Sequence, residues 1–274
     1  MDADRSGRGG LIALAGFAVC ALLFSWTLWL PLALRGPDQA AHSPLKYLHL
    51  FGSLGPALSA MLMARIYGGP DTLRRLLRRV VDWRVAPVWH VWAWLSPFFV
   101  LFIAQAIANA SGVDIQVGSL QRTTEYPELP IAVYWVAVLI FYGFGEEIGW
   151  RGFALPLLQM WLSPAAATLV LTAIWAVWHI PLFFFSTGMS NLGVAGTIGW
   201  LFSLLAGAFI LTALLNGARG SILIAAGFHA TMDIAFLGPP EVMMFVGAIV
   251  TFAGVFAFVR VVRNRGYVAV LMRE

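Results

Sequence analysis

The sequence predicts an all-α, polytopic membrane protein with about eight transmembrane helices, and three observations support this fold class. Hydrophobic residues occupy 60% of the 274 positions and charged residues only 11%, whereas soluble domains carry roughly 25% charged residues. The mean hydropathy is +0.83. No Asp, Glu, Lys or Arg occurs between Gly152 and Ala218, a stretch long enough for more than two crossings at about 20 residues each. This composition excludes a soluble globular fold.

Hydropathy predicts a single integral membrane domain over residues 1–274, built from helices alone. The predicted helices span about 11–34, 47–66, 86–109, 130–158, 164–185, 194–215, 220–238 and 242–260. The long apolar runs do not alternate as the strands of a membrane barrel do, so helices must satisfy the backbone hydrogen bonds. The first run exceeds the roughly 7–15 residues of a signal-peptide core, so we expect it to be retained as a helix. The single cysteine, Cys20, excludes a disulfide framework.

The distribution of basic residues predicts the orientation of the chain. A cytoplasmic N-terminus places 14 of the 17 basic residues on the inner side and leaves only Arg35, Lys46 and Arg122 outside, as the positive-inside rule requires. Both termini are therefore predicted to be cytoplasmic. The segment Leu73–Val85 interleaves arginines with apolar residues at helical spacing, which is typical of an amphipathic helix on a membrane surface. A topology-setting loop is the main interpretation, and a lipid or substrate dock is the alternative. Because the membrane accounts for the net charge of +4, no nucleic-acid partner is expected.

Ionisable side chains within apolar helices are costly, so each one is a candidate functional residue. Five such residues stand out in the predicted helices, namely Glu146, Glu147, His179, His229 and Asp233, and the basic Arg151 accompanies them as a sixth site residue. Glu147 and Arg151 are four residues apart and share a helix face in the favourable order for an ion pair. Arg151 is thus expected to offset Glu147 and to leave Glu146 the less neutralised carboxylate. A structural clamp is the main interpretation of this pair.

Helical spacing also predicts that the six residues converge. A turn near Ser163 lies 17 residues after Glu146 and 16 residues before His179, which sets both side chains roughly 25 Å from the turn in an antiparallel hairpin. His229 and Asp233 are again four residues apart. Isolated polar groups would be expensive in lipid, so we expect one interior cavity to collect them. Trp175, four residues before His179, is interpreted as a packing or interface residue.

Three motifs in this order resemble those of the CPBP intramembrane protease family, which includes the type II CAAX prenyl proteases. "EEIGWR" at residues 146–151 matches the EExxxR motif. "WAVWH" at 175–179 resembles FxxxH, and "HATMD" at 229–233 resembles HxxxN. The similarity extends over most of the chain, with a motif core at about 130–236. The resemblance implies an eight-helix protease fold that cleaves peptide bonds near the membrane.

The resemblance also implies roles for the motif residues. Glu146 corresponds to the catalytic glutamate and His179 and His229 to catalytic histidines, while Glu147 and Arg151 correspond to supporting residues. Trp175 stands where the family has Phe, a change expected to alter packing only. Asp233 stands where the family has Asn, and an ionised Asp accepts but does not donate a hydrogen bond. This substitution puts an oxyanion-binding role of Asp233 in doubt.

The predicted function is an intramembrane endopeptidase in which Glu146 activates water, His179 orients that water, and His229 with Asp233 faces the oxyanion. No cofactor is required by this mechanism. The alternative is a zinc site formed by Glu146, His179, His229 and Asp233, since carboxylates and imidazoles are zinc ligands. The expected partners are the lipid bilayer and a membrane-associated peptide or protein substrate, whose lipidation stays open. Two other classes also stay open: a transporter or proton relay, and a non-catalytic scaffold or immunity protein.

Overall fold

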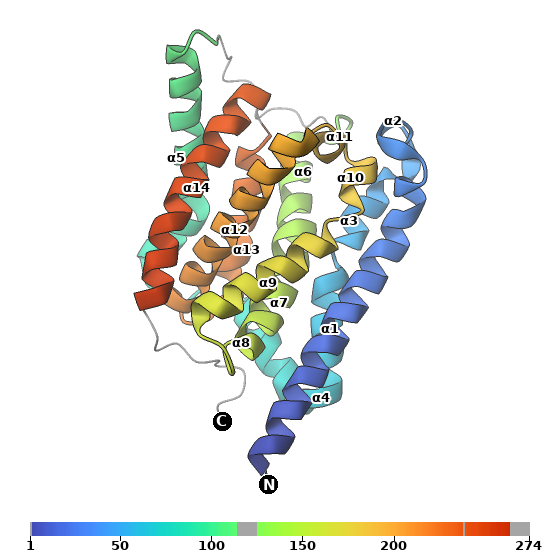
Figure 1. Cartoon of the computed structure of the whole chain (residues 1–274), viewed down its shortest axis with the longest axis vertical. Helices are drawn as coiled ribbons and strands as arrows, with labels where there is room; N and C mark the ends of the chain where they lie inside the picture. Colours follow the sequence, from blue (N-terminus) through green and yellow to red (C-terminus); the bar gives the residue numbers. More distant parts are fainter. Residues whose placement is uncertain (1, 114–124, 238, 264–274) are drawn as a thin grey trace.

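The computed structural model describes residues 2–113, 125–237 and 239–263, and these residues form helices and connections without any strand (Figure 1). Seven helices in these ranges are long and apolar enough to cross a membrane. The all-α, polytopic fold class is therefore confirmed. Arg122 and the basic residues of the C-terminal tail, which the predicted orientation uses, lie outside the described residues.

The spans follow the predicted order closely. In chain order they are Gly9–Ala33, Pro44–Val80, Pro87–Ala110, Ile131–Leu158, Pro164–Phe185, Gly193–Gly217 and Glu241–Arg263. The long helices within them are α1 (Asp2–Ala33), α4 (Gly55–Val80), α5 (Pro87–Ala110), α9 (Pro164–Trp178), α12 (Gly193–Gly217) and α14 (Pro240–Arg263). The short helices α2 (Gly36–Ala41), α3 (Leu48–Gly52), α10 (Leu182–Phe185) and α11 (Thr187–Ser190) lie at or near one end of the bundle (Figure 1).

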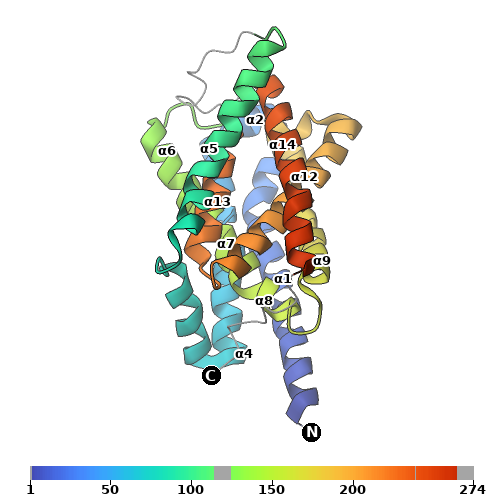
Figure 2. The ribbon, with the colours of Figure 1, turned by 90° about the vertical axis from the view of Figure 1, so that its left-hand side faces the viewer.

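The seventh predicted span, 220–238, is shorter than expected. It forms α13 (Ile222–Ala235), which has 14 residues and is about 21 Å long at 1.5 Å per residue. Ser221 caps its N-terminus by accepting a hydrogen bond from the backbone N–H of Ile224. Most of α13 is buried among its neighbours (Figure 2). A helix enclosed by protein need not match the bilayer thickness, which explains why hydropathy overestimated its length.

The Ile131–Leu158 span is not a uniform α-helix. The π-helical segments η3 (Val138–Phe144) and η4 (Trp150–Ala154) flank the short α7 (Gly145–Gly149), between α6 (Ile131–Ala137) and α8 (Leu155–Leu158). π-Helical turns occur frequently at functional sites. Glycines allow close packing here: a Cβ on Gly149 would lie 2.5 Å from Pro56 Cβ of α4. α7, which carries both candidate glutamates, is thereby set against α4.

α4 contains a sharp kink that separates its membrane-spanning part from its basic part. Gly69 has φ 72° and ψ −176°, a conformation that only glycine adopts readily, and Pro70 follows it. The predicted amphipathic segment is helical as far as Val80, and Leu76 on its inner face is fully buried. The kink therefore turns the basic segment back onto the protein.

Basic residues gather at one end of the bundle, where α1 begins and α4, α12 and α14 end (Figures 1 and 2). The arginines of α4, Arg84, Arg219 and the last turn of α14 all lie in segments at this end. Arg35 and Lys46 lie in the segments of the opposite end. The cytoplasmic assignment of the basic end, and of both termini, stays a prediction.

Candidate functional site

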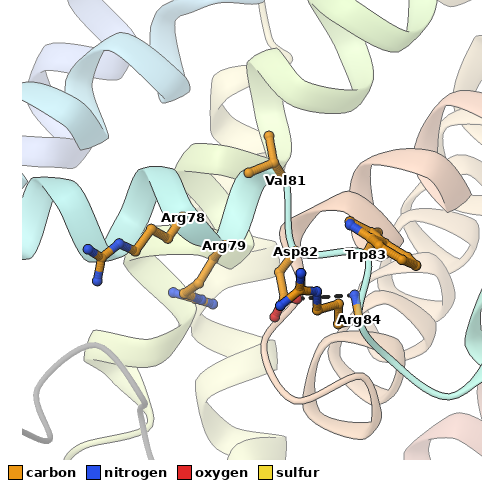
Figure 3. Close-up of a pocket in the computed structure, with 6 residues that line it drawn as sticks. All are labelled: Arg78, Arg79, Val81, Asp82, Trp83 and Arg84. Carbon is orange, nitrogen blue, oxygen red and sulfur yellow. Dashed lines mark hydrogen bonds between the residues drawn. The ribbon is translucent and has the colours of Figure 1, made fainter.

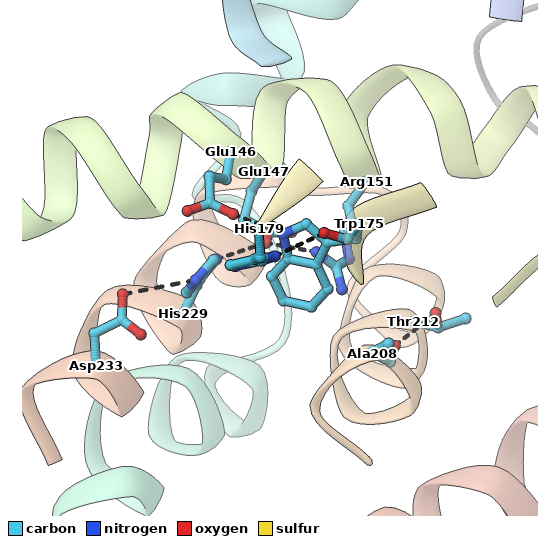
Figure 4. A network of polar contacts seen from close by, with 9 residues as sticks. All are labelled: Glu146, Glu147, Arg151, Trp175, His179, Ala208, Thr212, His229 and Asp233. Atoms are coloured by element: carbon cyan, nitrogen blue, oxygen red, sulfur yellow. Dashed lines mark hydrogen bonds and ion pairs between the residues drawn. The ribbon is translucent and has the colours of Figure 1, made fainter. Parts of the chain in front are cut away.

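Six polar residues meet where α7, η4, α9 and α13 face one another inside the bundle (Figure 4). Four of them are buried: Glu146, Glu147, Arg151 and His229 have exposed fractions of 5%, 0%, 0% and 9%. His179 and Asp233 are partly exposed. The structure thus brings together all six residues that the sequence predicted, from three separate parts of the chain.

Glu147 lies at the centre of one half of the site. Its Oε1 accepts a hydrogen bond from Arg151 Nη1 at 2.9 Å, within the same helical face. The same oxygen lies 2.7 Å from Nδ1 of His229 on α13. The predicted Glu147–Arg151 pair is confirmed, and the contact across to His229 joins that pair to α13. Because buried charges are costly unless paired, this network also holds the two segments together.

Glu146 lies in the other half and has a different partner. Trp175 Nε1 of α9 donates a hydrogen bond to Glu146 Oε2 at 2.8 Å. Among the described residues, Glu146 Oε1 has no hydrogen-bond partner. Arg151 pairs with Glu147 and leaves Glu146 without a basic side chain of its own, as the helical spacing predicted. Glu146 is therefore held by one oxygen and can receive a proton on the other.

Trp175 contacts several residues of the site, which the sequence did not indicate. Beyond its bond to Glu146, its ring lies 4.3 Å below the Arg151 guanidinium, in a cation–π arrangement. The ring centroid is 5.4 Å from that of His179 and 5.7 Å from that of His229. The expectation that Trp in place of the family's Phe alters packing only was wrong, because the indole N–H donates a hydrogen bond to Glu146. The N–H of a buried Trp usually has a hydrogen-bond partner, which is the signal that could have predicted the contact.

The hydrogen bonds of the two histidines fix which nitrogen faces the site. His179 Nδ1 lies 2.7 Å from the backbone carbonyl of Trp175. A carbonyl oxygen only accepts, so Nδ1 carries the proton and Nε2 is left as the acceptor nitrogen of the neutral ring. His229 Nε2 lies 3.6 Å from Asp233 Oδ2. The His229 ring is thus positioned between the carboxylates of Glu147 and Asp233 (Figure 4).

The described residues do not form a ready-made zinc site in this arrangement. In the part of the chain that the structure describes, no three His, Cys, Asp or Glu side chains are grouped so that they could hold a metal ion. His229 Nδ1 and Glu146 Oε2 are already engaged by Glu147 and Trp175, and zinc requires three or four ligands converging at about 2 Å.

The fold and the site together define an integral membrane protein with a buried carboxylate–histidine network among its helices. Comparison with known proteins gives a more specific result. The sequence model of the family described as "Type II CAAX prenyl endopeptidase Rce1-like" matches residues 128–235. A curated protein of Methanococcus maripaludis, "CAAX prenyl protease 2", is 30% identical over 93 residues, which are 32% of this chain and 34% of that protein. This region of the chain, which contains all three motifs, is thus similar to the CAAX protease family, as the motifs predicted.

Proposed function

We propose that this protein is an intramembrane endopeptidase that hydrolyses a peptide bond of a membrane-associated substrate with a water molecule activated by Glu146. The observation that carries the proposal is that the two adjacent glutamates have different partners. Glu147 is neutralised by Arg151 and engaged by His229, whereas Glu146 is held through one oxygen by Trp175. The similar protein of Methanococcus maripaludis is named "CAAX prenyl protease 2", which favours a lipidated substrate here.

In the proposed reaction, Glu146 takes a proton from water as the water oxygen bonds to the scissile carbonyl carbon. The Nε2 atom of His179 accepts a hydrogen bond from the same water and orients it. His229, positioned by Glu147, and Asp233 face the oxyanion that develops on the carbonyl oxygen. The proton held by Glu146 then passes to the leaving amine nitrogen as the C–N bond breaks. The reaction consumes one water molecule and gives a carboxylic acid and an amine.

The test is cleavage of membrane-associated peptides by the purified protein in liposomes. Prenylated and unprenylated peptides of the same sequence, each with Glu146→Ala as the inactive control, show whether the protein is a protease and whether it needs the lipid. Cleavage by the wild type alone supports the proposal. Ion or substrate flux without cleavage would assign a transporter or proton relay, and the absence of both would assign a scaffold.

Trp175→Phe is expected to reduce kcat by about 10- to 100-fold with little change in KM. Phe keeps the ring over Arg151 but removes the N–H donor to Glu146, and a hydrogen bond to a charged group contributes roughly 1.5–3 kcal/mol. Steady-state kinetics on the purified variant measure the effect. The matched control is Trp29→Phe, since Trp29 is likewise buried and donates its indole N–H to a main-chain oxygen, that of His49. Equal kcat losses in both variants would show that Trp175 acts only through stability.

Asp233→Asn is expected to keep or raise activity and to weaken its fall at high pH. A carboxyl donates to an oxyanion only when it is protonated, so its contribution is lost as pH rises, whereas the Asn amide donates at every pH. The pH profiles of kcat for both proteins, together with elemental analysis, measure this. Loss of activity together with loss of bound metal would instead support the zinc alternative. Full activity of wild type after metal removal would contradict that alternative.

A further inference from the structure

A second polar feature lies away from the site, at the basic end of the bundle. A pocket of about 340 Å³ is lined by Arg78, Arg79, Val81, Asp82, Trp83 and Arg84 (Figure 3). This volume falls within the roughly 300–1,000 Å³ of small-molecule sites. The lining residues come from the last turn of α4 and from the connection to α5. The pocket therefore lies between two membrane spans, at the membrane surface, whichever way the chain is oriented.

The charges of this pocket are poorly balanced by the protein itself. Arg78 and Arg84 are exposed and form no ion pair within the described residues. Asp82, the one acidic lining residue, accepts a hydrogen bond at Oδ1 from the backbone N–H of Arg84 at 3.2 Å. Its carboxylate thus stabilises the turn. The pocket keeps an excess of positive charge, which favours an anionic ligand.

One wall of the pocket is held rigidly. Arg79 is buried and donates from Nε to the carbonyl of Gly220 and from Nη1 to the carbonyl of Gly152, each at 2.8 Å. Ser221 Oγ donates to the carbonyl of Asp82 at 2.6 Å. These bonds fix the end of α4 and the connection against η4 and the start of α13. A preformed wall reduces the entropy that a ligand loses on binding.

Apolar residues beside the arginines indicate the source of the anion. Val81 and Trp83 have exposed fractions of 70% and 64%. Trp is enriched at membrane–water interfaces, where its ring sits at the level of the lipid headgroups. The Arg84 guanidinium lies 5.9 Å from the Trp83 ring centroid. Basic side chains next to exposed interfacial side chains match a phosphate that carries acyl chains better than a free ion in water.

We propose that this pocket binds the phosphate of an anionic phospholipid headgroup, with Arg78 and Arg84 as the main ligands and Val81 and Trp83 contacting the glycerol and upper acyl region. This is a binding site separate from the Glu146 site, and it does not depend on the proposed protease activity. Its lining residues lie within the segment Leu73–Val85, for which a lipid or substrate dock was the alternative interpretation. Attraction between exposed charges is screened by salt, so binding is expected to weaken as ionic strength rises.

The experiment measures binding of short-chain phosphatidylglycerol to the purified full chain in a neutral detergent, by isothermal titration calorimetry. Short-chain phosphatidylcholine and inorganic phosphate are the comparison probes. The variant Arg78→Gln/Arg84→Gln is expected to weaken phosphatidylglycerol binding by about 30-fold, because each basic residue near an anionic surface contributes about 1 kcal/mol. Asp82→Asn keeps the turn-capping oxygen but removes the negative charge, so it is expected to tighten binding several-fold.

The matched control is Arg260→Gln/Arg263→Gln, which removes the same charge from exposed positions in the last turn of α14 at the same end of the bundle. A change of less than about 3-fold in this control supports a defined pocket. Equal losses in both double variants would overturn it in favour of general charge attraction. Equal binding of phosphatidylcholine, or of inorganic phosphate, would overturn the assignment to an anionic lipid. Melting temperatures of all variants establish that each one is folded.

Discussion

Glu146→Gln is expected to lower kcat by about 10²- to 10⁴-fold while the fold stays intact, because that is the typical contribution of a general base. Gln is nearly isosteric with Glu, and its amide oxygen can still accept the hydrogen bond that Trp175 donates to Glu146 Oε2. The amide cannot take a proton from water. Initial rates on a membrane-associated peptide in liposomes, normalised to folded protein, measure the loss.

The matched control for this change is Glu241→Gln, at an exposed glutamate in the first turn of α14. It makes the same chemical replacement outside the site and is expected to keep wild-type turnover. Melting temperatures within a few degrees of wild type for both variants show that stability does not explain the result. A folded Glu146→Gln protein with near wild-type kcat would show that another group removes the proton, and Glu147 would be the next residue to test.

The membrane spans were predictable because a bilayer requires about 20 apolar residues per crossing. The helix predicted at 86–109 is found at Pro87–Ala110, and the one predicted at 194–215 is found at Gly193–Gly217. Hydropathy does not distinguish a helix that faces lipid from one that protein encloses, so the length of α13 was overestimated. The π-helical turns on both sides of α7 are also invisible to hydropathy, since they change the hydrogen-bond register and leave the composition unchanged.

Local contacts of the site were predictable from helical spacing, whereas contacts between helices were not. The four-residue spacing of Glu147 and Arg151 predicted their pair correctly. The bond from His229 to Glu147 joins residues 82 positions apart, and only the packing of α13 against α7 determines it. Helix packing also determines the hydrogen bond from the Trp175 indole to Glu146. The family motif gives no hint of this bond, because Phe has no donor at that position. The catalytic roles of all six residues stay predictions.

The Glu147–Arg151 pair is expected to contribute mainly to stability, whereas Glu146 is expected to contribute mainly to turnover. Both side chains are fully buried, and Arg151 also stacks on Trp175 at 4.3 Å. Arg151→Ala is expected to destabilise the protein by about 3–5 kcal/mol, because it leaves the Glu147 carboxylate buried without its cationic partner. Expression yield and melting temperature in detergent are expected to fall at least as much as the turnover of the protein that remains folded.

The double variant Glu147→Gln/Arg151→Met distinguishes the loss of a partner from the loss of a catalytic group. Replacing both members of a buried pair by neutral side chains of similar size removes the uncompensated charge, so the melting temperature is expected to recover much of what Arg151→Ala loses. Turnover is not expected to recover, since a neutral Gln at position 147 binds His229 Nδ1 more weakly than a carboxylate does. A fully stable Arg151→Ala protein without turnover would contradict this assignment and place Arg151 directly in the reaction.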